Sequence, residues 1–272
     1  MQRHITTTKL FLACSALLLA VSLALFAFAQ TKAPAKPAAQ APVPRQLLRL
    51  QFLRIKSGMG TEWREFRKNE TLPMLQKAGV KEQTVSVIAQ FGEGGVLIVT
   101  PIESLAQFDG PGNAARALGQ EGAAAYNAKG ARFTESTHAI VLETRPELSS
   151  PPPPGYQFKL FVVTTTTVAP GHFDEYENYV KTALLPVIKK AAPKGYLLGR
   201  VAYGGATNQY MSALFVDSWA DLQRYRAAQI KEATAAKLAG KTAGIVTNTE
   251  NAVYGFVPEL SVVPTAQNAG NK

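Results

Sequence analysis

Two histidines carry the most versatile chemistry in the part of this sequence that follows its apolar start. His172 comes directly after Pro170 and Gly171, at the beginning of a helical pattern, and His138 precedes a strand-like run. An imidazole can ligate a haem iron or act as a general base near neutral pH. A histidine in the first turn of a helix is more often a solvated cap than a ligand. We therefore treat His172 as a candidate catalytic residue and both histidines as candidate cofactor ligands.

Polar side chains on two predicted strands are candidates for ligand binding. Residues 47–55 and 158–168 alternate between two faces, as half-buried strands do. The more polar face contains Arg49 and Gln51 on the first strand and Lys159 on the second. Such side chains suit the wall of a ligand chamber. The alternation does not show which face points into the protein, so Arg49, Gln51 and Lys159 enter as ligand-binding candidates only.

The sequence lacks the residue patterns of a dense metal site. Its single cysteine, Cys14, lies in the apolar start, and there is neither a His-x-x-x-His pair nor an aspartate-rich loop. Asp174, Glu175 and Glu177 cluster, but they occupy a predicted first helical turn, where carboxylates stabilise the helix dipole. We expect no metal.

The sequence repeats itself at a constant offset. Four anchors recur 113 residues later, namely Gly58 as Gly171, Trp63 as Tyr176, Phe66 as Tyr179 and Pro73 as Pro186. Both copies end in Pro-Glu-Leu-Ser. Such self-similarity predicts a duplicated fold. The shared aromatic residues have helical spacing, so we expect them to pack between helix and sheet, and a functional site is expected where the copies differ.

Each copy shows the pattern strand, helix, strand, strand, helix, strand. Strands are predicted over 47–55, 84–91, 96–100 and 137–143 in the first copy, and over 158–168, 196–202, 209–216 and 251–257 in the second. Pro73 should kink or restart the first helix. The fold class is therefore α+β, with two ferredoxin-like β-α-β-β-α-β modules. Each sheet has one uncovered face, so we expect the modules to pack sheet to sheet as an intramolecular α+β barrel.

The composition of the chain predicts where the two modules begin and end and what lies between them. A basic start, an apolar run and Ala27-Phe28-Ala29 have the form of a secretory signal peptide. Four consecutive prolines, Pro151 to Pro154, mark a boundary between the copies. The expected organisation is a signal peptide (1–29), a Pro/Ala-rich tether (30–44), two modules (45–149 and 156–261) with a Pro-rich linker (150–155) between them, and a disordered tail (262–272). We expect a secreted or periplasmic protein, in contact with the membrane only through the signal segment before its cleavage.

The distribution of charge along the sequence argues against a nucleic-acid partner. The formal net charge is +10, and removal of Arg3 and Lys9 with the signal segment leaves +8. The basic residues are scattered, and no run alternates aromatic and basic side chains as a nucleic-acid platform does. We expect no nucleic-acid partner, and we leave assembly into a homo-oligomer open.

The Pro-Gly-x-Phe-x-x-Tyr motif at 170–176, the mid-helix Leu-Pro pairs and the Gly-Gly hairpin resemble the dimeric α+β barrel superfamily. That group includes antibiotic-biosynthesis-type monooxygenases and NIPSNAP-like and EthD-like proteins, and the resemblance covers most of 45–261, once per copy. It implies a fused tandem form. Some members bind haem and some use no cofactor, so the resemblance implies a fold and leaves the reaction open.

Three hypotheses follow. The first is a non-enzymatic exported barrel that binds a small, partly apolar ligand or a protein partner, and it is favoured because no catalytic set is recognisable. The second is a monooxygenase-like enzyme, with haem at His172 or without a cofactor. The third is a structural protein of the cell envelope, suggested by the tether and the basic charge.

Overall fold

Eight antiparallel strands close into one barrel in the structure, a computed structural model that describes residues 44–91 and 95–263. The expected signal segment, nearly all of the tether and residues 264–272 of the expected tail lie outside the described residues. Val262, just past the expected end of the second module, pairs with Gln83 through two backbone hydrogen bonds of 2.8 Å.

The first half of the chain contributes four strands and one helical layer. Its elements are β1 (Leu47–Ile55), α2 (Gly60–Phe66), η1 (Arg67–Thr71), α3 (Leu72–Lys77), β2 (Thr84–Ile88), β3 (Val96–Ile102), η2 (Leu105–Phe108), α4 (Asn113–Ala131), β4 (Thr134–Thr144) and η3 (Pro146–Leu148).

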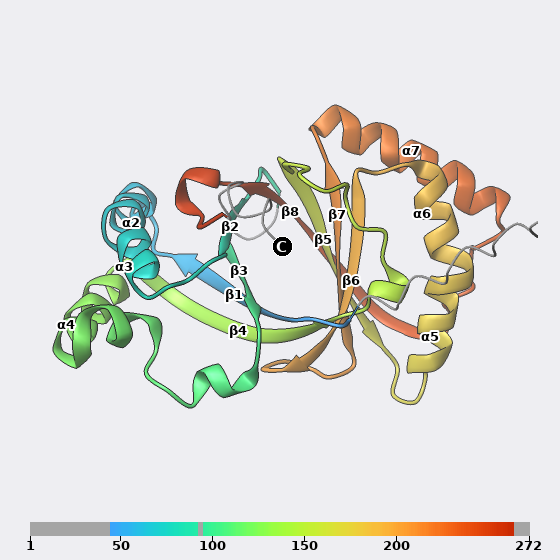
Figure 1. Cartoon of the computed structure of the whole chain (residues 1–272). Helices are drawn as coiled ribbons and strands as arrows, with labels where there is room; N and C mark the ends of the chain where they lie inside the picture. Colours follow the sequence, from blue (N-terminus) through green and yellow to red (C-terminus); the bar gives the residue numbers. More distant parts are fainter. Residues whose placement is uncertain (1–43, 92–94, 264–272) are drawn as a thin grey trace, which may run out of the picture. The chain divides into compact units, whose positions relative to one another are not determined.

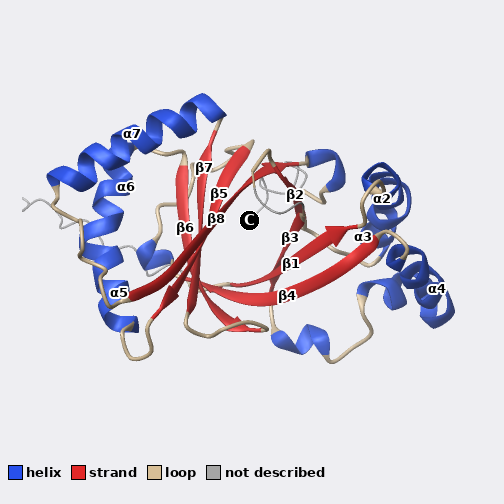
Figure 2. Ribbon diagram, turned by 180° about the vertical axis from the view of Figure 1, so that it is seen from behind, coloured by secondary structure: helices blue, strands red, loops and turns tan. Residues whose placement is uncertain are grey.

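The second half follows the same order, except that no short helix precedes its last helix. Its elements are β5 (Leu160–Val168), α5 (Phe173–Tyr179), η4 (Val180–Leu184), α6 (Leu185–Ala191), β6 (Gly195–Tyr203), β7 (Gln209–Val216), α7 (Trp219–Ala235), β8 (Val246–Phe256) and η5 (Pro258–Leu260). In Figure 1 helices α2 to α4 cover one side of the barrel and α5 to α7 the opposite side. Figure 2 shows the strands between the two helical layers from behind. No helix among the described residues is long and apolar enough to cross a membrane.

The strand order around the barrel is β1-β3-β2-β8-β5-β7-β6-β4. The expected α+β barrel is therefore present, but the halves meet differently from the expectation of two sheets packed face to face. They join edge to edge, through β2 with β8 and β4 with β6. An open sheet leaves unpaired backbone N–H and C=O groups along both edges, and pairing the edges of one half with those of the other satisfies them.

The first helical segment of each half, α2–η1–α3 and α5–η4–α6, contains a π-helical turn just before a proline. In the first half η1 precedes Pro73, and in the second half η4 precedes Pro186. Proline has no N–H, and its ring collides with the carbonyl four residues earlier, so a regular α-helix cannot continue through it. The wider turn accommodates the proline without ending the helix. The sequence predicts that Pro73 kinks or restarts the helix; the structure instead has a π-helical turn before it, and the helix continues.

The barrel interior is filled by apolar side chains. Leu50, Ile140, Phe161, Met211 and Phe215 belong to the cluster that fills it, packed with partly buried Leu48 and Phe52. The alternation on β1 is therefore resolved: the set with Leu48, Leu50 and Phe52 points inward, and the set with Arg49 and Gln51 points toward the helical layer.

Strands β4 and β8 are longer than the sequence pattern predicts. Both begin with a polar stretch, at 134–139 and 246–251, that is mostly exposed and lacks the alternation of a half-buried strand. These stretches are extended because each pairs along one side with a well-formed neighbour, β1 for β4 and β5 for β8. Strand pairing thus overrides the weak local signal.

A buried arginine holds the seam between β4 and β6. The N–H of Arg145 donates to Leu198 O on β6 at 2.7 Å, and its side chain is 7% exposed. The guanidinium pairs with Glu143, and its Nε lies 3.2 Å from Glu177 Oε1 on α5. Tyr210 donates its hydroxyl to the same Glu177 oxygen at 2.8 Å. Strands from both halves and a helix of the second half are thus connected through one charged group.

Replacement of Arg145 should therefore destabilise the whole barrel. We expect Arg145→Met to lower the free energy of unfolding by about 1.5–3 kcal/mol, because two carboxylates lose a charged hydrogen-bond partner. Arg45→Met is the matched control. Arg45 pairs with Glu147 at 2.8 Å but is 47% exposed, so we expect a loss of at most about 1 kcal/mol. Urea unfolding followed by circular dichroism measures both, and equal losses would contradict the clamp role.

Candidate functional site

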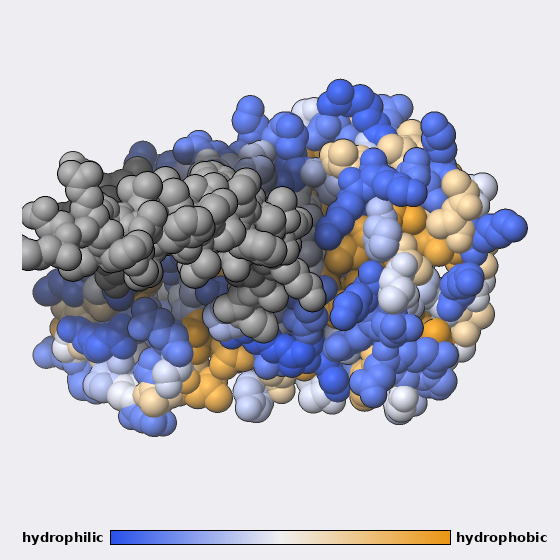
Figure 3. Space-filling view, turned by 45° about the vertical axis from the view of Figure 1, so that its right-hand side comes forward, coloured by the Kyte–Doolittle hydropathy of each residue, from blue (hydrophilic) through white to orange (hydrophobic). Residues whose placement is uncertain are grey.

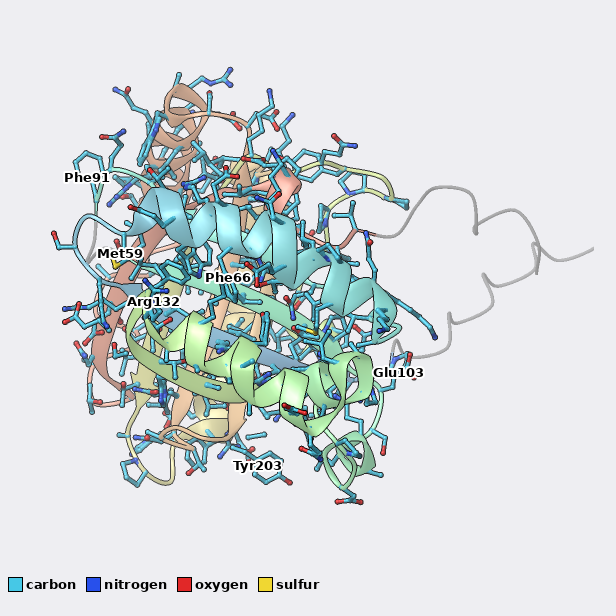
Figure 4. All side chains as sticks on the ribbon, turned by 90° about the vertical axis from the view of Figure 1, so that its left-hand side faces the viewer. Met59, Phe66, Phe91, Glu103, Arg132 and Tyr203 are labelled. Carbon is cyan, nitrogen blue, oxygen red and sulfur yellow. The ribbon has the colours of Figure 1, made fainter. Side chains whose placement is uncertain are left out.

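A cavity of about 810 Å³ lies between the sheet and the helices of the first half. Figure 4 looks onto this helical layer, where α2–α3 and α4 lie side by side over the strands and Phe66 is labelled between them. The wall combines apolar and polar side chains from β1, β4 and the helices, including Trp63, Phe66, Leu53, Ile98, Arg49, Gln51, Arg67, Thr71, Tyr126 and Asn127. A smaller recess of about 440 Å³ between α3 and α4 shares Met74 and Tyr126 with it.

The first half is hollow because α4 carries small side chains where it faces the sheet. Ala114, Ala115 and Ala123 line the cavity, and Gly119 interrupts the helix with a φ of 73° that only glycine adopts without strain. In the second half, the corresponding layer is one continuous cluster to which α7 contributes Leu222 and Tyr225. In the first half the buried residues form two separate clusters. Two similar sheet-and-helix layers therefore differ in how their buried side chains are grouped.

The outer surface of the second half is mostly hydrophilic. Figure 3 shows hydrophilic residues over most of the helical side, with apolar residues visible in the recesses between them. The hydrophobic side chains of this layer are directed inward, among them Tyr176, Val180 and Tyr210, which are at most 4% exposed. The cavity of about 810 Å³ in the first half is therefore the candidate ligand site.

Arg67 is the most unusual residue of the cavity wall. It is 4% exposed, and its Nε donates to Leu260 O and its Nη2 to Gln83 Oε1, both at 2.8 Å. Gln83 in turn donates to Thr100 Oγ1 at 3.0 Å. All these acceptors are neutral. Burial lowers the pKa of the Arg67 guanidinium to about 10, because the charged form loses its hydration.

Two hydroxyl groups form a second polar contact on the cavity wall. Tyr126 on α4 and Thr71 at the end of η1 lie with their hydroxyl oxygens 2.8 Å apart. Burial raises the pKa of Tyr126, so its hydroxyl stays protonated at neutral pH. The Tyr126 ring stacks on Phe66 with 5.2 Å between centroids. The wall therefore offers hydrogen-bond donors beside aromatic surface.

The predicted ligand-binding residues separate into two groups. Arg49 and Gln51 both line the cavity, and Gln51 donates to Thr137 Oγ1 at 3.2 Å. They do so from the helical side of β1, whereas the sequence argument looked for a ligand between the two sheets. Lys159 is exposed ahead of β5 and lies close enough to Asp217 to lower the pKa of that carboxyl, so the structure places it apart from the cavity.

The two candidate histidines lie at the surface. His172 precedes α5, its side chain is 45% exposed, and its Nδ1 lies 2.7 Å from Glu175 Oε2. His138 is exposed on β4 and stacks on Phe52 with 6.4 Å between ring centroids. Neither lines either of the two cavities. Among the described residues, no three His, Cys, Asp or Glu side chains come together as a metal site.

Sequence reasoning missed Arg67, although the repeat contained the signal that finds it. The 113-residue offset sets Arg67 opposite Val180 and Thr71 opposite Leu184. Val180 is fully buried in the packed layer of the second half. A buried cation in one copy at the position of a buried valine in the other is the kind of asymmetry that marks a site. Trp63 and Phe66 are core residues as predicted, but they also line the cavity.

Comparison with known proteins agrees with the barrel. No protein-family model and no curated protein matches the sequence. The crystal structure of a "putative monooxygenase" from Lactobacillus acidophilus NCFM aligns with a TM-score of 0.54 and 8% identity over 81% of this chain and 97% of that chain. An anthrone oxidase-like protein gives 0.53 and 14% identity over 84% and 100%. A mutant chlorite dismutase from Candidatus Nitrospira defluvii gives 0.50 and 10% identity over 79% and 92%. The fold is that of the dimeric α+β barrels. At these identities the likeness is one of fold alone.

A haem ligated by histidine does not fit the residues that line the two cavities, since neither His138 nor His172 is among them. We therefore expect added haem to produce no Soret band that depends on His172. The measurement is an absorption titration of the wild type and of His172→Ala, with His138→Ala in parallel. A Soret band in the wild type that disappears in His172→Ala would contradict this expectation.

Proposed function

We propose that this protein binds a small, partly apolar ligand in the cavity of its first half. The observation that carries the proposal is the contrast between the two halves: the buried residues of one helical layer form one continuous cluster, and those of the other are divided beside a cavity of about 810 Å³. Protein interiors are close-packed, and a space of this size falls in the range of small-molecule sites.

The composition of the wall supports the same proposal. Trp63, Phe66 and Ile98 provide apolar surface, and Gln51 and Asn127 provide amide groups beside it. Ligand sites are mostly apolar, with a few polar groups that orient the ligand. The wall residues also come from rigid strands and helices, which suits a preformed site.

The proposal predicts that a larger side chain in the cavity weakens binding. The neutral fluorescent probe N-phenyl-1-naphthylamine should bind the protein with increased emission. Ala123→Leu should weaken this binding by about ten-fold or more, because Ala123 is buried on the cavity wall and its replacement occupies ligand space.

Ala124→Leu is the matched control, since Ala124 is the next residue on α4 and is exposed away from the cavity. It should bind the probe as the wild type does. Failure of the wild type to bind, or equal binding by both variants, would refute the proposed site.

The alternative function is oxidation of a quinol or polyphenol by a monooxygenase-like enzyme without a cofactor. It is supported by the fold shared with the monooxygenase and anthrone oxidase-like structures. Oxygen consumption with such substrates distinguishes the alternatives. Steady turnover that Ala123→Leu removes and Ala124→Leu retains would replace simple binding with catalysis at the same cavity.

We also propose that the chain is a fused pair of ferredoxin-like modules and that it is exported. The strand orders β4-β1-β3-β2 and β8-β5-β7-β6 within the halves, and a π-helical turn before a proline in each, support the first proposal. The signal-like first 29 residues support the second. N-terminal sequencing of the protein from its host tests export: a mature chain beginning at Gln30 is expected, and one retaining Met1 would contradict cleavage.

A further inference from the structure

The charges on the cavity wall are not balanced. Arg67 and Arg49 both line the cavity, and the acidic residue of its described wall is Glu135, which is exposed on β4. Within residues 44–91 and 95–263, neither guanidinium forms an ion pair with a carboxylate. A buried cation without an anion is unfavourable, because the lost hydration is not replaced.

Arg145 shows how this chain neutralises a buried arginine at the seam between the two halves. Arg145 is as buried as Arg67, and it is matched by two carboxylates, Glu143 and Glu177. Among the residues that the structure describes, Arg67 has as acceptors the Leu260 carbonyl and the Gln83 amide oxygen. Its Nη1 has no hydrogen-bond acceptor among the described residues, and the side chain borders the cavity. The missing anion can therefore come from a ligand.

Arg49 provides a second cation on the same wall. It lies on the helical side of β1, next to Gln51 of the same face, and it is partly buried. None of the described residues accepts a hydrogen bond from its guanidinium. Two guanidinium groups can together bind a carboxylate through charge-assisted hydrogen bonds, which are stronger than neutral ones.

We infer that the ligand of this cavity is an amphiphilic anion, whose acidic group lies between Arg49 and Arg67 and whose apolar part lies against Trp63 and Phe66. This inference rests on the proposed function and specifies its ligand class. The chemistry is that of a small aromatic or aliphatic carboxylate. A neutral ligand would fill the same apolar space and leave both cations without a partner.

The test compares two ligands of nearly the same shape that differ in charge, 4-butylbenzoate and 4-butylbenzyl alcohol, as competitors of N-phenyl-1-naphthylamine. We expect the carboxylate to displace the probe at a concentration about ten-fold lower than the alcohol. Arg49→Gln should reduce this preference to less than about three-fold. Circular dichroism shows whether Arg49→Gln is folded, and the displacement by each competitor is expressed relative to the affinity of this variant for the neutral probe. Arg132→Gln, an exposed arginine outside the cavity, should keep the full preference.

Arg67 also holds Leu260, so its removal can destabilise the fold. Arg67→Lys retains the charge and is the second variant; it should keep a preference for the carboxylate, while Arg67→Gln, if folded by circular dichroism, should lose it. Equal displacement by both competitors in the wild type, or a preference that survives Arg49→Gln and Arg67→Gln, would overturn the inference and leave the proposed cavity standing. Absence of probe binding in the wild type would overturn both.

Discussion

Closure of the barrel depends on the pairing of sheet edges. Each half of the chain supplies four strands, and an open four-stranded sheet leaves two edges with unsatisfied backbone groups. The β2–β8 and β4–β6 pairings satisfy both edges of both halves. At each seam an arginine side chain connects the two halves. Arg145, just before η3, contacts Glu177 of α5, and Arg67 of η1 donates to the carbonyl of Leu260 in η5. The helical layers are carried on this frame.

The same frame supports two different interiors. In the second half, Leu222 and Tyr225 of α7 fill the space over the sheet. In the first half, the alanines of α4 and its break at Gly119 leave that space open. The difference extends to the seams, because two carboxylates neutralise Arg145, whereas no carboxylate among the described residues pairs with Arg67. The strands that close the barrel come from both halves, so one frame carries a helical layer with a continuous buried cluster and a helical layer with a cavity.

Much of the architecture followed from patterns in the chain. Element order, the interruption at Pro73 and the position of the proline run between the halves depend on local backbone chemistry, which neighbouring residues determine. The polar starts of β4 and β8 could not be predicted, because their extended form comes from strand partners distant in sequence. For the site, Arg49 and Gln51 were identifiable as polar residues on a strand. Their direction was not, because alternation defines two faces without saying which one is buried where.

The sequence by itself determined the α+β class, the recurrence of one strand-and-helix pattern, and the residues that make the two halves unlike. Only the tertiary structure decided that the halves join by their edges, that Arg49 faces the helices, and that Arg67 lies buried beside a cavity. The physical reason is that hydrogen-bond periodicity and proline geometry act between near neighbours. Packing density and the balance of buried charge depend on side chains such as Arg67 and Leu260, which are far apart in the chain and meet only after the barrel has closed.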